Sequence, residues 1–146
     1  NDFVYSKRVA FARFFFVSQT DLLDILSNGN VPTKVMKHMP KIFGAIETLE
    51  LIEEGVRPSV QGMHACIGVE YVKFTKELKL LGKVEIYMQW IIDTMRSSLK
   101  DITQAQMKAK GSVDKLAWIQ NTPAQVLLLL NNCHWVINCE KAFLNF

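Results

Sequence analysis

One stripe of apolar residues constrains the fold more than any other feature of this sequence. It begins after Gly82, and its members are separated by four, three, one, three, four and three residues: Val84, Met88, Ile91, Ile92, Met95, Leu99 and Ile102. Such spacings predict one long helix that is apolar along a single side. Polar and charged residues occupy the other side, and Gly111 in a polar stretch ends the pattern. The rest of the chain must therefore supply a surface that covers this stripe.

A last helix is predicted from Thr122 and Pro123, which have the order of cap and proline expected at a helix N-terminus. It is apolar nearly all round, with a run at Val126–Leu130 and further apolar residues beyond. A helix without a polar face is predicted to be buried among neighbours. We expect some of those neighbours to lie outside this sequence.

Aromatic residues crowd the segment FARFFFVS, Phe11 to Ser18, without helical spacing. This favours a strand with apolar residues on both faces, with the stem of Arg13 lying on apolar surface. Ser18 then opens the pattern SQTD, which caps a helix, and Asn28-Gly29 predicts a left-handed end to that helix.

A second helix is predicted from about Val31 to Phe43. Its apolar stripe and its outward lysines are Val35, Met36, Met39, Ile42 and Phe43, and Lys34, Lys37 and Lys41. Pro40 is predicted to kink or end it near Met39. From Thr48 to Phe74, imperfect alternation and β-favouring residues predict a short meander of two or three strands.

These elements predict a mainly α fold: a helical bundle segment with a small β-hairpin element as a minor α+β component. At 146 residues, with 49% hydrophobic and 21% charged residues, the chain suits one folded domain. We expect a division into 1–80, with the strand, two helices and meander, and 81–146, with the long helix and buried C-terminal helices.

Charge and cysteine content exclude several classes of protein. The net charge of +3 is small and scattered, which argues against nucleic-acid binding. The most apolar run is far shorter than the ~20 residues of a membrane span. Cys66, Cys133 and Cys139 form an odd set without a CxxC pair, which predicts free thiols in a reducing, cytosol-facing compartment.

No residue pattern predicts a catalytic, cofactor or metal site. Gly82-Lys83 lacks the upstream glycine loop and following hydroxyl of GxxxxGK[ST], so ATP binding is not expected. Cys133, His134 and Cys139 share a predicted helix, but the two cysteines are six residues apart and face roughly opposite directions. They are expected to pack as small apolar residues.

Other polar residues also favour structural roles. His38, His64 and His134 are far apart in sequence without an acidic partner beside them, and a folded-back Cys66–His134 pair remains open. The carboxylate pairs Glu53-Glu54 and Asp21 with Asp24 are the remaining acid–base candidates; Asp21 and Asp24 favour a helix start. Phe14, Phe15 and Phe16 could stack bases, but a buried strand is the favoured interpretation.

The segment Lys7 to Gly29 resembles the dynein heavy chain pattern KRxxFPRFxFxSxxDLLxILS. Gly82 to Tyr87 is similar to the family's G-x-V-E-x-W-L, and Asn121 to Val126 to its P-A-Q-V element, with Trp135 near a downstream aromatic pair. Asp24 to Gly29, DILSNG, is more similar to axonemal than to cytoplasmic heavy chains. The sequence departs from the pattern at Ala12, where the family has proline, at Pro40, and at residues 64–69.

This resemblance implies a piece of the dynein linker, the lever upstream of the first AAA module. It implies no cofactor here, with ATP and Mg in the AAA ring of the parent motor. The implied partners are that ring, microtubules and other dynein subunits, in the cytoskeleton of a cilium or flagellum.

Two alternatives of other classes are a free-standing helical scaffold or adaptor that binds a partner protein and, more distantly, a small Cys–His enzyme. A GxxxxGK[ST] motif downstream in the reading frame would separate the motor from both.

Overall fold

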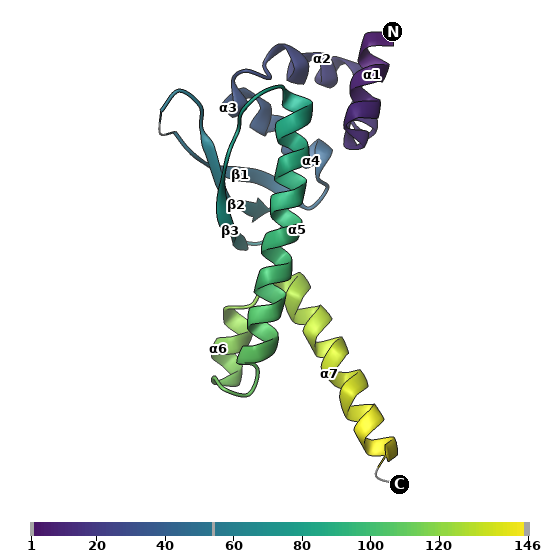
Figure 1. The fold of residues 1–146 in the computed structure, drawn as a ribbon, viewed down its shortest axis with the longest axis vertical. Coiled ribbons are helices and arrows are strands. Elements are labelled where there is room, and N and C mark those ends of the chain that lie inside the picture. Colours follow the sequence, from purple (N-terminus) through teal and green to yellow (C-terminus); the bar gives the residue numbers. More distant parts are fainter. Residues whose placement is uncertain (1, 54, 145–146) are drawn as a thin grey trace. The chain divides into compact units, whose positions relative to one another are not determined.

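A computed structural model describes residues 2–53 and 55–144, and it is mainly helical with one small antiparallel sheet, as predicted (Figure 1). The chain forms two compact units, one up to Ser98 and one from Leu99 on. The boundary lies inside helix α5 (Val84–Ala109), whereas the sequence suggested a division at 80/81, before this helix. The difference arises because the first half of α5 packs into the same core as the sheet.

The first unit begins with short helical elements and continues into the sheet. In chain order these are α1 (Asp2–Ala10), η1 (Ala12–Phe16), α2 (Gln19–Ser27), α3 (Pro32–Val35), η2 (Met36–His38), α4 (Met39–Ile42), β1 (Ile46–Ile52), β2 (Ser59–Ala65) and β3 (Tyr71–Lys79).

The strand predicted from Phe11 to Ser18 is wrong, because this segment contains the 3₁₀-helix η1. Phe11, Phe14 and Val17 are buried, and their spacing of three matches the three residues per turn of a 3₁₀-helix. Phe15 and Phe16 consequently point outward, with 51% and 75% of their surface exposed. The segment therefore has one buried side, not two.

Arg13 joins η1 to the end of α4. Its guanidinium lies 5.1 Å from the centre of the Phe43 ring and donates a hydrogen bond to the Ile42 carbonyl at 3.3 Å. The side chain therefore lies on apolar surface as predicted, while its charged head is held by a backbone oxygen and an aromatic face.

Helix α2 begins as its sequence predicts and ends differently. Ser18 Oγ accepts the Asp21 N–H at 3.2 Å, which confirms the cap. The helix stops at Ser27, but the left-handed end predicted at Asn28-Gly29 is wrong, because positive φ angles occur at other glycines. Gly29 instead permits close packing, since an added Cβ would lie 3.2 Å from Val84 Cβ.

The second predicted helix is broken into three turns, α3, η2 and α4. Pro40 lies in the first turn of α4, which confirms the interruption near Met39. The apolar stripe is buried and the lysines are exposed, as predicted: Val35, Met36, Met39, Ile42 and Phe43 lie in the core, and Lys34, Lys37 and Lys41 face outward.

The sheet confirms the predicted meander, with strand order β1-β2-β3 and both pairs antiparallel. Leu49, Val60 and Phe74 project from its three strands into the core. The pairing of β2 with β3 shifts between Val60 and Gly62, which pair with Leu78 and Lys73. The β3 residues between these partners, 74–77, are therefore out of regular register with β2.

The stripe of α5 is buried over its first half, which confirms the prediction for Val84, Met88, Ile91, Ile92 and Met95. Tyr87 is also fully buried and donates its hydroxyl to the Gly29 carbonyl at 3.0 Å. Burial raises the pKa of this phenol well above its ordinary value. The side chain therefore remains neutral in the core.

The second unit contains the end of α5, α6 (Lys115–Gln120) and α7 (Ala124–Leu144). Its small core consists of Trp118, Val126 and Leu130, packed with Leu99, Ile102, Ala109 and Leu127. The Trp118 indole donates to the Gln106 carbonyl at 3.1 Å, and Asp114 caps α6 by accepting two backbone N–H groups.

Helix α7 is apolar as predicted, but its burial within this chain is small. Val126 and Leu130 are the buried residues of its described part. Leu128, Trp135 and Phe143 expose 67%, 70% and 82% of their surface. No described helix is long and apolar enough to cross a membrane.

Candidate functional site

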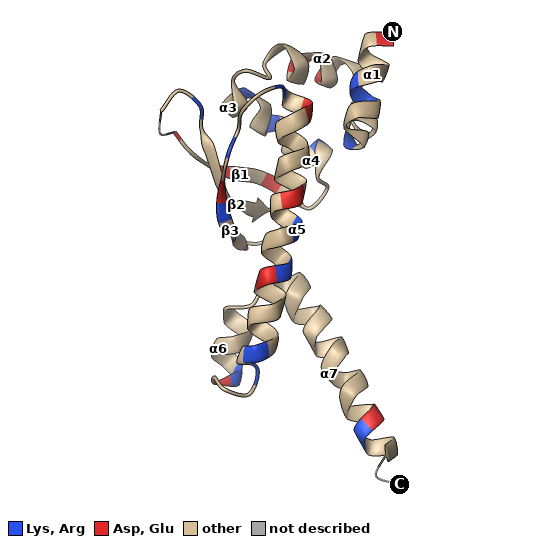
Figure 2. Cartoon of the chain, in the orientation of Figure 1, with Lys and Arg blue, Asp and Glu red and all other residues tan. Residues whose placement is uncertain are grey.

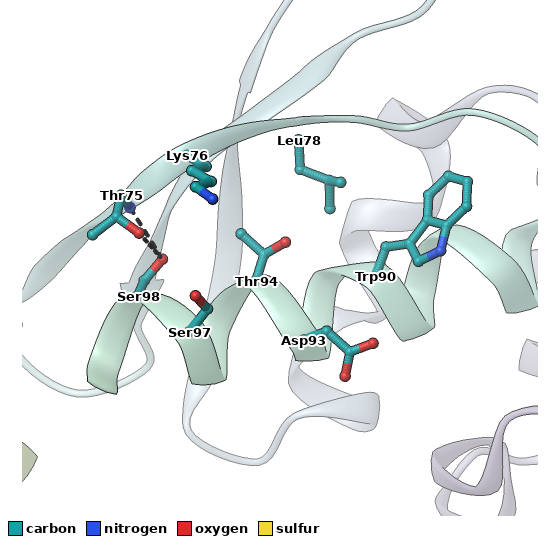
Figure 3. A pocket seen from close by; sticks show the side chains of 8 residues that line it. All are labelled: Thr75, Lys76, Leu78, Trp90, Asp93, Thr94, Ser97 and Ser98. Carbon is teal, nitrogen blue, oxygen red and sulfur yellow. Dashed lines mark hydrogen bonds between the residues drawn. The ribbon is translucent and has the colours of Figure 1, made fainter. Parts of the chain in front are cut away.

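A groove lies between the end of β3 and the first half of α5 (Figure 3). Thr75 lies in the part of β3 where the pairing with β2 shifts, and its backbone N–H donates a hydrogen bond to Ser98 Oγ, 3.0 Å away. Ser98 is fully buried, so this bond fixes the distance between the strand and the helix at one end of the groove. The groove has a volume of about 320 Å³ and is lined by Thr75, Lys76, Leu78, Trp90, Asp93, Thr94, Ser97 and Ser98.

The lining of the groove combines an apolar patch with opposite charges. Trp90 is 42% exposed, and with Leu78 it provides the apolar part. Lys76 lies on the strand side and Asp93 on the helix side, as Figure 3 shows. The described lining residues include neither cysteine nor histidine, the usual nucleophile and base of covalent catalysis.

The cysteines and histidines singled out in the sequence occupy separate elements. Cys66 is exposed after β2, and Cys133 and Cys139 are half-buried on α7. His134 lies on α7, and its Nε2 is buried without a hydrogen bond. In residues 2–53 and 55–144, no three His, Cys, Asp or Glu side chains are placed to hold a metal ion.

His38 corrects the expectation that the histidines lack acidic partners. Its Nε2 lies 2.7 Å from Asp24 Oδ2, and its Nδ1 lies 3.6 Å from Asp21 Oδ1. The sequence spacing gave no sign of this, because α2 and η2 approach only in the folded chain.

Both aspartates also form ion pairs with lysines, from Lys37 to Asp24 at 2.7 Å and from Lys41 to Asp21 at 2.8 Å. Hydrogen bonds from Lys37 and then His38 lower the pKa of Asp24 to about 2. Hydrogen bonds from Lys41 and then Ser18 lower the pKa of Asp21. The pair therefore stays ionised near neutral pH, which suits a structural role.

The remaining candidates are dispersed. Glu53 is exposed, and its neighbour at position 54 lies outside the described residues. Gly82, with a φ of +80°, forms the turn before α5, and Lys83 follows it. Phe15 is covered in part by the edge of the Tyr5 ring, 6.3 Å away. Figure 2 shows acidic and basic segments interspersed along the ribbon, in keeping with the scattered charge of the sequence.

Comparison with known proteins identifies the family. The family model described as dynein heavy chain, N-terminal region 2, matches residues 1–106. The chain is 44% identical over 98% of its length to the dynein alpha chain of the flagellar outer arm of Chlamydomonas reinhardtii. It is 34% identical over 97% of its length to the ciliary dynein beta chain of Heliocidaris crassispina and to human dynein axonemal heavy chain 17.

The chain spans about 3% of the length of each of these relatives. Their flagellar, ciliary and axonemal names agree with the predicted location in the cytoskeleton of an axoneme. Four separate motifs had suggested the same family, and the family model matches the whole first compact unit and the start of the second. The chain belongs to the dynein heavy chain family, as part of the N-terminal region of an axonemal-type heavy chain.

Proposed function

We propose that this segment is a non-catalytic, mechanical part of a dynein motor, the linker that relays ATP-driven changes in the AAA ring to movement along microtubules. The observation that carries the proposal is helix α5 in a chain of this family. Its 26 residues run without interruption through both compact units. At 1.5 Å per residue this is a rod of about 39 Å.

Close packing along the rod supports a role in transmitting force. The first half of α5 is buried against the sheet and the short helices, and its second half contributes to the small core with α6 and α7. Close-packed interiors have low compressibility and transmit strain. A lever requires that property, whereas an enzyme would require converging reactive groups.

The exposed face of α7 supports the idea of a larger helical bundle. Leu129, Val136 and Phe143 are seven residues apart in turn, and each is substantially exposed. A seven-residue apolar repeat is suited to packing along another helix. We infer that other helices of the same heavy chain cover this face, and the family match favours them over a separate partner of a free-standing adaptor.

The wider assignments rest on the family. ATP and Mg would be bound by the AAA ring of the parent heavy chain, with no cofactor in this segment. The partners would be that ring, microtubules and other dynein subunits, without nucleic acid or membrane.

Calorimetric titration of the purified chain with Mg-ATP tests the non-catalytic part of the proposal. The expected result is no heat of binding up to millimolar nucleotide, because the sequence contains no phosphate-binding glycine loop. The matched control is a heavy-chain preparation that includes the AAA ring, which should bind. Saturable binding by this chain alone would overturn the proposal.

A further inference from the structure

We propose that His38 is a proton-dependent latch, a contact that holds α2 against η2 more firmly when the imidazole is protonated. As an imidazolium, His38 donates hydrogen bonds to both Asp24 and Asp21. As a neutral imidazole, it keeps only the hydrogen bond to Asp24. The side chain of His38 is only 5% exposed, so its state depends on these neighbours more than on water. The latch is separate from the proposed lever function and can fail without affecting it.

The geometry shows why one proton matters. Nε2 is 2.7 Å from an Asp24 oxygen, a distance that requires a proton between the two atoms. In a neutral ring with that proton, Nδ1 carries a lone pair, and this buried nitrogen faces the Asp21 carboxylate at 3.6 Å without a hydrogen bond. A second proton on Nδ1 turns this unfavourable contact into a donor facing a carboxylate. Small movements of the Asp21 side chain would then complete the bond.

Four charged side chains lie around the His38 ring. Asp21 and Asp24 face it from α2, Lys37 lies beside it in η2, and Lys41 approaches from α4. The pKa of both carboxyls is lowered, so they remain ionised at pH 5 and above. Lysine stays protonated to far above neutral pH. Imidazole is the side chain that ordinarily changes its charge between about pH 5 and 8.

The lysines do not replace the imidazole as a link between the elements. Lys37 and Lys41 expose 63% and 51% of their side chains, so water and salt weaken their ion pairs. The contacts of His38 are shielded by its burial. Loss of its proton is therefore expected to loosen α2 from η2, and the proton passes to the solvent.

Thermal unfolding of the full 146-residue chain between about pH 5.5 and 8 tests the latch. The midpoint should fall by about 3 °C or more as the pH rises. In His38→Gln, which keeps an amide donor but cannot gain a proton in this range, that fall should be largely lost. His64→Gln replaces an imidazole on the sheet and should keep the pH dependence of the native chain.

A second variant and a local measurement test the proposal even if His38→Gln does not fold. Asp21→Asn should reduce the pH dependence, because it removes the charged acceptor of the second bond. Amide hydrogen exchange, corrected for intrinsic rates, should show α2 losing protection as the pH rises while α7 does not. A native chain without this fall, or an undiminished fall in His38→Gln or Asp21→Asn, would overturn the proposal.

Discussion

At the scale of single residues, Gly62 allows Tyr71 to cross the outer face of the sheet. An added Cβ on Gly62 would lie 2.4 Å from the Tyr71 hydroxyl and 2.5 Å from its ring. The ring packs beside His64, 4.8 Å between ring centres, and its hydroxyl donates a hydrogen bond to the Glu50 carboxylate. Burial and then this carboxylate raise the pKa of Tyr71 to about 12. Three strands are thereby joined through one phenol.

Gly62→Ala should displace the Tyr71 ring and return the pKa of its phenol toward the ordinary 10.0. Because a raised pKa favours the neutral phenol in the folded chain, its stabilisation is complete below about pH 10 and is lost between pH 10 and 12. Phenolate absorbance measured against pH would detect the change. Gly44→Ala is the control, because no atom lies within 4 Å of its added Cβ. An unchanged titration in Gly62→Ala would contradict the described contact.

At the scale of elements, periodic patterns in the sequence correctly predicted those helices and strands whose structure is determined by residues close together in the chain. The spacing of the α5 stripe, the Ser18 cap and the alternation before Phe74 predicted α5, α2 and the meander, because local hydrogen bonding and one buried side decide each of them. Segment 11–18 does not form the predicted strand, because consecutive aromatic residues mask the spacing of three between its buried residues, Phe11, Phe14 and Val17. The contacts of His38 required the tertiary approach of α2 and η2, which no local pattern contains.

Ile92→Asp tests the buried stripe of α5. Ile92 is 8% exposed within the main core, so the substitution would bury a charge without a partner and should destabilise the fold by about 3–5 kcal/mol. Ile86→Asp is the matched control on the same helix, because Ile86 is 42% exposed and its replacement should cost far less. Urea unfolding of both variants measures the difference, and equal effects would refute the assignment of the buried face.

At the scale of the whole molecule, the chain exposes apolar side chains in the groove beside Trp90 and along α7. The groove beside Trp90 and the outer face of α7 each belong to one compact unit, and α5 continues through both units. The sequence predicted an α-rich segment without a reactive site, and the family match places it in dynein heavy chains. The boundary at Ser98 was not predictable, because it depends on which core each half of α5 joins.

The most direct test of the mechanical role interrupts α5 inside an intact heavy chain. Lys100 is exposed and lies within the helix, so Lys100→Pro would remove one backbone hydrogen bond and cost about 3 kcal/mol of helix stability without altering the core, whereas Lys100→Ala keeps the helix. Microtubule gliding velocity and ATP hydrolysis should be measured on the same preparations. The account predicts that Lys100→Pro hydrolyses ATP but moves microtubules much more slowly than Lys100→Ala. Gliding at the speed of the control, or loss of hydrolysis in parallel with gliding, would contradict it.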